Sequence, residues 1–219
     1  MKKVIIVTGG IGSGKSVVCE EFAKIGAKVI QSDKVGHTCL EPQGAAYAET
    51  VAAFGKRILN FDGTINRKEL GKLAFENREN IELLNDVTHK HILKEIVDTV
   101  DKFQNQCNTI SRDCGEEKQP NSICDRDCCA FDMIVLEIPI FPAVNFPYDA
   151  VISVIASENI RVERVLARGG ISRDIAESIM SLQPSNEEYR SFADYCIEND
   201  GGIDELRRRA AEIFNEIRL

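Results

Sequence analysis

Residues 4–16 of the chain read Val4-Ile5-Ile6-Val7-Thr8-Gly9-Gly10-Ile11-Gly12-Ser13-Gly14-Lys15-Ser16. The apolar run at the start is typical of a short, buried β-strand. The glycine-rich part that follows fits the P-loop pattern, G-x-x-x-x-G-K-[ST], at every fixed position. Its glycines let the backbone curl so that successive N–H groups point inward, and a helix beginning near Lys15 adds the positive end of its dipole. This stretch therefore predicts a cradle for phosphate groups between a strand and a helix.

The last two residues of the pattern carry side chains suited to a polyphosphate. Lys15 can reach the β- and γ-phosphates as a mobile point charge, and the Ser16 hydroxyl can ligate a magnesium ion that bridges them. A glycine-rich turn that only joins strand to helix is the alternative, and the Lys-Ser pair disfavours it. The residues expected to contact a nucleotide here are Gly10, Ile11, Gly12, Ser13, Gly14, Lys15, Ser16 and Val17.

The chain has 219 residues, a formal net charge of −8 and eight cysteines. This length suffices for one α/β domain with insertions, whose core needs no disulfides. The acidic balance disfavours nucleic acid and anionic membranes as partners, because both require clustered Lys and Arg. No apolar run approaches the length of a membrane span. We therefore expect a soluble cytoplasmic protein, and no obligate protein partner is evident.

A helix and a second strand are predicted directly after the P-loop. Apolar residues recur at helical spacing from Lys15 to Ile25, and Gly26 stands where a helix C-cap belongs. Residues 27–30 then read as a buried strand of a doubly wound parallel sheet. Asp33 follows at the carboxyl end of that strand, so we expect it to face the same crevice as the P-loop. Capping of the next helix is the alternative role for Asp33.

Residues 44–103 are mainly helical in pattern and predict an inserted helical substrate domain. Within them Asp62-Gly63 marks a turn, and Asn66 precedes a helix that continues to Leu73. The side chains expected to be buried are those of Phe54, Phe61, Leu70, Leu73, Phe75, Leu83, Leu84, Ile92, Ile96 and Val100.

Cysteine and histidine raise the question of a metal site. Residues 104–130 lose all periodicity and predict a long exposed loop with five cysteines, Cys107, Cys114, Cys124, Cys128 and Cys129. Paired C-x-x-C motifs are absent, so a loop without a site, a metal site and redox chemistry all stay open. His89 and His91 are two residues apart and lie on different faces of a helix, so a two-histidine metal site is not expected.

The second half of the chain returns to an α/β pattern. Strands are expected at 133–136, 150–155 and 195–197, with Glu137 at the end of the first. Helices are expected at 158–168, at two places around Gln183-Pro184 within 171–192, and at 203–218. The helix over 158–168 carries three basic residues, Arg161, Arg164 and Arg168, which either form a solvated face or contact an anion.

These motifs occur together and in a defined order: Thr8-Gly9-Gly10-Ile11-Gly12-Ser13-Gly14-Lys15-Ser16, Val29-Ile30-x-x-Asp33, His89, Leu136-Glu137-Ile138-Pro139, Arg164-x-x-x-Arg168 and Ala193-Asp194-Tyr195-x-Ile197-x-Asn199. In this set the chain resembles the dephospho-CoA kinases over nearly everything outside the cysteine-rich segment. The resemblance implies an α/β P-loop kinase fold, a parallel sheet flanked by helices, with an inserted helical substrate domain and a lid. It implies one domain with a nucleotide-binding core (1–33, 131–160 and 193–219), a substrate-binding insertion (34–103), the cysteine-rich loop (104–130) and the lid (161–192).

The resemblance also implies an activity, the magnesium-dependent transfer of the γ-phosphate of ATP to the ribose 3′-hydroxyl of dephospho-coenzyme A. The catalytic residues it implies are Asp33, which accepts the hydroxyl proton, Lys15, Arg164 and Arg168. It places Asn199 with the P-loop residues beside ATP, and Ser16 on the metal. The substrate contacts it implies are Asp33, His89, Glu137 and Pro139.

Three positions depart from the family pattern. Gln31 stands where an acidic residue is frequent, Glu137 replaces the usual Asp, and Leu93 replaces an arginine. Glu137 keeps the charge and can still orient metal-bound water. Lys90, His91 or Lys94 could take over the contact that the arginine makes.

Two other functions stay open on the sequence. One is a P-loop kinase for another nucleoside or nucleotide, and the other is a regulator that binds ATP without transferring phosphate. A carboxylate at position 33 argues against the regulator, because binding alone needs no general base.

Overall fold

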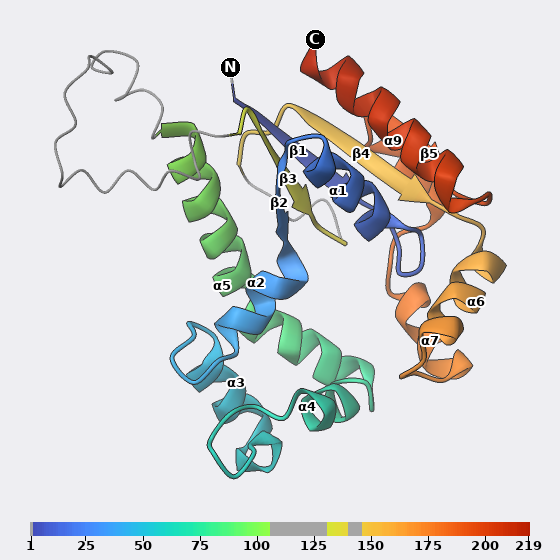
Figure 1. Cartoon of the computed structure of the whole chain (residues 1–219). Coiled ribbons are helices and arrows are strands. Elements are labelled where there is room, and N and C mark those ends of the chain that lie inside the picture. The colour runs from blue at the N-terminus through green and yellow to red at the C-terminus, as the bar shows by residue number, and fades with distance from the viewer. Residues whose placement is uncertain (1, 106–130, 140–145) are drawn as a thin grey trace, which may run out of the picture. The chain divides into compact units, whose positions relative to one another are not determined.

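A five-stranded sheet in the order β2-β3-β1-β4-β5 lies at the centre of the P-loop part of the chain (Figure 1). The computed structural model describes residues 2–105, 131–139 and 146–219. The strands are β1 (Lys3–Thr8), β2 (Lys28–Gln31), β3 (Met133–Glu137), β4 (Ala150–Ile155) and β5 (Tyr195–Glu198). β1 runs parallel to both β3 and β4, and β4 runs parallel to β5. The predicted parallel α/β fold is therefore confirmed.

The central strand β1 is buried on both faces of the sheet. Val4, Ile5, Ile6 and Val7 have no exposed surface. Because successive side chains point to opposite faces of a strand, this continuous burial requires cover on both sides. The apolar run in the sequence is thus the signature of a strand in the middle of a covered sheet.

Helices α1 (Lys15–Lys24) and α9 (Ile203–Arg218) pack together over one face of the sheet (Figure 1). The rings of Phe22 and Phe214 meet there with centroids 5.2 Å apart. α1 ends at Lys24 with Ile25 as its C-cap, and the predicted glycine follows at Gly26, whose φ of 106° lies in the left-handed region. Two backbone hydrogen bonds close this Schellman motif, from the N–H of Ala27 to the carbonyl of Phe22 and from that of Gly26 to the carbonyl of Ala23.

The other helices are α2 (Ser32–Cys39), α3 (Tyr47–Phe54), α4 (Arg67–Ala74), α5 (Arg78–Asn105), α6 (Glu158–Arg168), α7 (Arg173–Ser181) and α8 (Asn186–Ser191). A single 3₁₀ turn lies at Lys56–Ile58. α6, α9 and β4 have the bounds that the periodicity predicts, and α7 and α8 are the two short helices expected around Gln183.

The chain forms two compact units. The first contains residues 1–30 and 99–219 and holds the sheet, and the second contains residues 31–98. The predicted insertion, 34–103, ends a few residues later than the second unit, because α5 continues without a break from one unit into the other. The assignment of this insertion to substrate, and of residues 161–192 to a lid, stays a prediction.

The second unit corrects three expectations about burial. Phe54, Leu70 and Ile58 form its core, but the predicted core residues Phe61, Phe75 and Leu83 are exposed. Phe61 lies at the tip of a turn closed by the N–H of Gly63 on the carbonyl of Asn60, so it projects into solvent. Phe75 caps the end of α4. On α5, Leu84 packs into the core, and its neighbour Leu83, about 100° further round the helix, faces outward.

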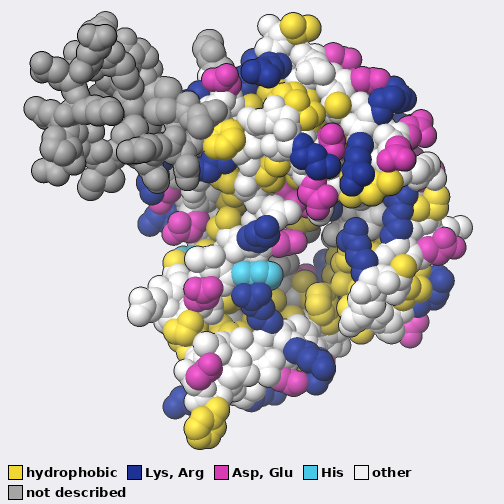
Figure 2. All heavy atoms as spheres, in the orientation of Figure 1, with side chains coloured by type: hydrophobic (Ala, Val, Ile, Leu, Met, Phe, Trp, Pro, Cys, Tyr) yellow, Lys and Arg dark blue, Asp and Glu magenta, His cyan; other side chains and the backbone are white. Residues whose placement is uncertain are grey.

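Acidic and basic side chains are interspersed over the face shown in Figure 2, and many pair three or four residues apart along a helix. Among the described residues, no helix is both long and apolar enough to cross a membrane. The described cysteines, Cys19, Cys39 and Cys196, are free thiols. The predictions for the five cysteines of residues 104–130 fall on positions 107–129, which lie outside the described residues.

Candidate functional site

The P-loop turns into α1 at Gly14. This residue has a φ of 106° and is the N-cap of the helix. A Cβ at Gly14 would lie 2.3 Å from the amide nitrogen of Asn199, so the position requires glycine for its conformation and for its close neighbour. The amide of Asn199, which is buried, donates to the carbonyl of Ser13 over 2.7 Å. Asn199 thus supports the P-loop from the end of β5.

Ser16 and Glu137 meet at the first turn of α1. The Ser16 hydroxyl donates to Oε1 of Glu137 over 2.7 Å, and Glu137 is the last residue of β3, buried beside β1. A hydroxyl and a carboxylate side by side form a set of hard oxygen donors that suits Mg²⁺. The residues therefore fit the metal that a P-loop implies. Among the described residues no group of three or more His, Cys, Asp or Glu side chains is arranged to hold a metal by itself.

Several backbone N–H groups of the loop are left for a ligand. Within the described part of the chain, the N–H groups of Gly12, Gly14 and Ser16 donate to no acceptor. The Nζ of Lys15 donates to the carbonyl of Gly10 over 3.0 Å, which draws the ammonium back over the loop. Backbone N–H donors and the ammonium of Lys15 therefore converge at the positive end of α1.

Ile11, by contrast, is held from outside the loop. Its N–H donates to Oε1 of Gln183 over 2.8 Å, and its carbonyl accepts from Nε of Arg161 over 2.9 Å. Its side chain packs on the apolar cluster between α6 and α7. The sequence predicts that Ile11 contacts nucleotide, but in this structure its N–H and its carbonyl are bound to Gln183 and to Arg161. The sequence leaves Arg161 open between a solvated face and an anion contact, and it gives no signal for a role of Gln183.

Of the two predicted lid arginines, Arg164 is fixed and Arg168 is exposed. The Nη2 of Arg164 donates to Oδ1 of Asn199 and to the carbonyl of Gly201, each over 3.4 Å. Its Nη1 is buried and has no hydrogen-bond partner among the described residues. Arg168, at the end of α6, is exposed and makes no contact of this kind in the described part of the chain.

Pro139 lies just past β3 and is fixed through its carbonyl. The hydroxyl of Tyr189 on α8, which is fully buried, donates to that carbonyl over 2.8 Å. Burial raises the pKa of Tyr189 to about 12, because the phenolate would be desolvated there, and nearby Arg161 opposes this only in part.

The two predicted site residues of the second unit are both exposed. Asp33 lies in the first turn of α2, two residues after β2 ends, and His89 lies on α5. Desolvation lowers the pKa of His89, against the attraction of Asp86. His91 and Lys90 both contact the carboxylate of Glu49, at 3.0 and 2.5 Å. These contacts lower the pKa of Glu49, and the hydrogen bond from Lys90 has a larger effect than the one from His91.

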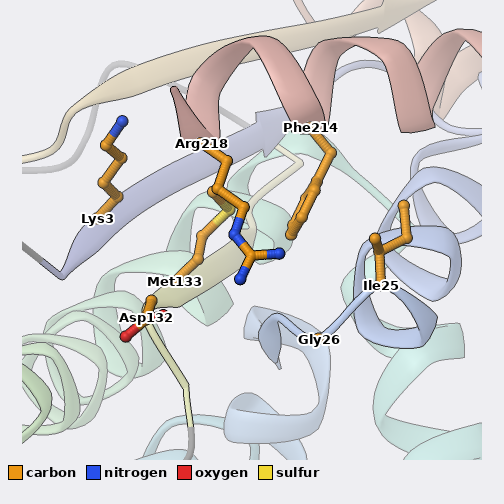
Figure 3. A pocket seen from close by; sticks show the side chains of 7 residues that line it. All are labelled: Lys3, Ile25, Gly26, Asp132, Met133, Phe214 and Arg218. Atoms are coloured by element: carbon orange, nitrogen blue, oxygen red, sulfur yellow. The ribbon is translucent and has the colours of Figure 1, made fainter.

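A separate pocket of about 420 Å³ opens at the amino-terminal ends of β1 and β3. It is lined by Lys3, Ile25, Gly26, Asp132, Met133, Phe214 and Arg218 (Figure 3). The guanidinium of Arg218 points into it, whereas the ammonium of Lys3 turns to the carbonyl of Ile217. The P-loop lies at the opposite, carboxyl end of β1, so this pocket is no part of the phosphate cradle.

The sequence model of the dephospho-CoA kinase family matches residues 3–114 and 127–205 of the chain. The chain belongs to the dephospho-CoA kinase family. The match includes the P-loop, Glu137, Asn199 and both predicted lid arginines. It passes over residues 115–126, which lie within the cysteine-rich segment.

Curated dephospho-CoA kinases align with almost the whole chain. The protein of Carboxydothermus hydrogenoformans is 32% identical over 215 residues, which cover 97% of this chain and 93% of that protein. The protein of Corynebacterium efficiens is also 32% identical, and 96% of this chain and 95% of that protein align. The family is thus supported along the full length and not by the P-loop alone.

Solved structures of related proteins have the same fold. A dephospho-CoA kinase from Campylobacter jejuni superposes with a TM-score of 0.59 at 25% identity, covering 99% of this chain and 97% of the other. A protein from Thermus thermophilus reaches a TM-score of 0.65 at 24% identity, covering 98% and 97%. A shikimate kinase from Acinetobacter baumannii, with a TM-score of 0.50 at 15% identity over 100% and 96%, shares the fold. This dephospho-CoA kinase family member therefore has the fold of P-loop kinases.

Proposed function

We propose that the protein transfers the γ-phosphoryl group of ATP to the ribose 3′-hydroxyl of dephospho-coenzyme A, which gives coenzyme A and ADP. The observation that carries this proposal is the family match over residues 3–114 and 127–205, which contains the whole P-loop. The donors that converge at the start of α1 supply what such a transfer needs, namely positioning and positive charge around the phosphates.

On the nucleotide side, Lys15 and the loop N–H groups hold the phosphates. As charge develops on the transferred group, the Lys15 ammonium leaves the carbonyl of Gly10 for the phosphate oxygens. The Nη1 of Arg164, which has no hydrogen-bond partner among the described residues, is a ready donor to a nucleotide bound beside Asn199. Arg168 adds positive charge from the lid, and closure of the lid excludes water that would otherwise accept the phosphoryl group.

Magnesium is the metal we propose for this site. Ser16 would ligate it directly, and Glu137 would hold one of its water molecules. When bound, the ion neutralises charge on the β- and γ-phosphates. The hydrogen bond between Ser16 and Glu137 supports this assignment, because it orients the hydroxyl and the carboxylate toward one another.

On the acceptor side, we assign Asp33 the role of general base. Asp33 follows β2 at its carboxyl end, which is the edge of an open α/β sheet where ligands bind. Its carboxylate takes the proton as the 3′-oxygen forms its bond to phosphorus and the bond to the leaving ADP breaks. Contacts from His89, Glu137 and Pro139 hold the substrate, and the hydrogen bond from Tyr189 fixes the Pro139 backbone for that role.

We also propose the cytoplasm as the place of action, with dephospho-coenzyme A and ATP as partners and neither nucleic acid nor a membrane among them. The net charge of −8 supports this, since it disfavours capture by nucleic acid or by anionic membrane.

The direct test supplies ATP, Mg²⁺ and dephospho-coenzyme A and detects the product by mass. Coenzyme A should accumulate, and AMP, CMP, uridine and shikimate should remain unmodified. Phosphorylation of one of those four while dephospho-coenzyme A is ignored would refute the proposed substrate. ATP binding without transfer to any acceptor would favour a regulator instead.

Asp33→Asn tests the proposed base. A positioned general base contributes about two to four orders of magnitude, so kcat should fall by about 100-fold or more while the Kd for ATP stays unchanged. Lys34→Ala, which alters the adjacent exposed side chain, serves as the matched control. Wild-type turnover in Asp33→Asn would remove Asp33 from the mechanism.

A further inference from the structure

Arg161 is a buried cation directly behind the phosphate cradle. Only 6% of its surface is exposed, although it belongs to a helix with exposed residues at Glu163 and Arg168. Its Nε donates to the carbonyl of Ile11, and its Nη2 donates to Oε1 of Gln183 over 3.2 Å. The guanidinium therefore reaches the P-loop from α6 and is fixed there by two neutral oxygens.

Gln183 and Arg161 together hold the backbone of Ile11. The same Oε1 that accepts from Arg161 also accepts from the N–H of Ile11, so three residues share one small network. Both backbone polar groups of Ile11 are thus bound to side chains from α6 and from the connection between α7 and α8. The position of the loop at Ile11 depends on these side chains and not on the loop alone.

The guanidinium of Arg161 lies where a side chain at position 10 would be, and Gly10 leaves that space open. A Cβ at Gly10 would lie 2.1 Å from Nη2 of Arg161 and 2.4 Å from its Cζ. The φ of Gly10 lies outside the left-handed region, unlike those of Gly9, Gly12 and Gly14. The backbone at position 10 therefore does not itself demand glycine, but a side chain there would force the guanidinium of Arg161 to move from its present position.

Among the residues that the structure describes, no carboxylate pairs with the charge of Arg161. Within the described part of the chain it makes no ion pair, and desolvation lowers its pKa, which Tyr189 and then Glu158 oppose only in part. Buried charges are normally paired, and an unpaired one is costly unless an anion arrives. The phosphates of a bound nucleotide are the anions for which the adjacent loop is built.

We propose that Arg161 is a positioning residue for polyphosphate: it fixes the P-loop at Gly10 and Ile11 and supplies a permanent positive charge behind it, with Gln183 as its partner. This inference rests on the proposed function only in that the polyphosphate is ATP. It predicts that Arg161 contributes to the affinity for ATP but not to the affinity for adenosine, because adenosine has no phosphate for the loop or the charge to bind.

The test measures the affinity of the full chain for ATP and for adenosine by calorimetric titration and competition. In Arg161→Met the Kd for ATP should rise about tenfold or more, as expected for loss of charged hydrogen bonds, while the Kd for adenosine stays unchanged. Arg161→Lys, which keeps the charge, should fall between Met and wild type. Arg173→Gln, which removes an exposed arginine of α7, is the matched control and should bind ATP normally. Equal losses for ATP and adenosine, or no loss for ATP, would overturn the proposal.

A double-mutant cycle tests the contact itself. Gly10→Ala alone should weaken ATP binding, because the new methyl group displaces the guanidinium or the loop. In the double variant with Arg161→Ala the two losses should be clearly less than additive, since the same contact is removed twice. Fully additive losses would show that Gly10 and Arg161 act separately. Because binding of ATP is measured without an acceptor, these results stand apart from the dephospho-coenzyme A assay, whose failure would refute the proposed function alone.

Discussion

Tyr189 links the stability of the fold to pH through a single hydroxyl group. It is fully buried, it donates to the carbonyl of Pro139, and its pKa is raised to about 12. In the unfolded chain a tyrosine ionises near pH 10. The protonated form is therefore favoured by folding, so its contribution is complete below about pH 10 and is lost as the pH rises toward 12.

Tyr189→Phe separates the hydrogen bond from the ionisation. At pH 8 the variant should be less stable by about 1 kcal/mol, because the carbonyl of Pro139 loses its donor. Between pH 8 and pH 11 the wild type should lose about 1 kcal/mol that the variant does not lose, so the gap should close. Urea unfolding at both pH values measures this difference.

Tyr148 provides the control, because 42% of its surface is exposed. Tyr148→Phe should follow the wild-type pH dependence. A constant gap between wild type and Tyr189→Phe from pH 8 to pH 11 would contradict the role given to the buried hydroxyl.

At the scale of the element, side-chain caps define where several helices begin. Asn66 accepts from the N–H groups of Lys68 and Glu69 at the start of α4, as the sequence predicts. Ser185 and Glu188 form a complete capping box on α8. These caps satisfy N–H groups that a helix cannot satisfy internally.

Asn66→Ala should destabilise the second unit by about 1 kcal/mol, because α4 loses the acceptor for two N–H groups. Asn66→Asp keeps an oxygen at the same place and should retain wild-type stability within a few tenths of a kcal/mol. Thermal unfolding followed by circular dichroism compares the two variants. Equal losses in both would mean that the cap does not stabilise α4.

At the scale of the whole molecule, binding of nucleotide should stabilise the folded chain. A ligand at about 100 times its Kd adds about 2.7 kcal/mol when it binds only the native state. For a chain of this size that corresponds to an increase in Tm of about 5–10 °C. Mg²⁺ with ATP should therefore raise the Tm, and Lys15→Ala should lose most of the increase because the charge nearest the phosphates is removed.

Lys72→Ala is the matched lysine control, since Lys72 pairs with Glu69 on the surface of the second unit. It should show the wild-type increase in Tm with ATP. An undiminished increase in Lys15→Ala would contradict the proposed contact between Lys15 and the phosphates.

The sequence predicts those features whose signal is local. The P-loop, the Schellman end of α1 at Gly26, the cap at Asn66 and the bounds of α9 all follow from residues within a few positions of one another. The predicted burial of Phe61, Phe75 and Leu83 is wrong, because apolar character alone does not say which way a side chain faces.

The sequence by itself determined the P-loop motif, most elements of the parallel sheet and its flanking helices, and the family, since each is written in a contiguous or strictly ordered set of residues. It did not delimit the helices α2, α3 and α5. Only the tertiary structure decided that Ser16 meets Glu137, that Asn199 supports Ser13, and that Arg161 reaches the loop at Ile11. These partners lie 121, 186 and 150 positions apart. In the sequence the three arginines of α6 cannot be told apart. Which of them is buried depends on the surface that the helix packs against, because burial is a property of the neighbours and not of the residue.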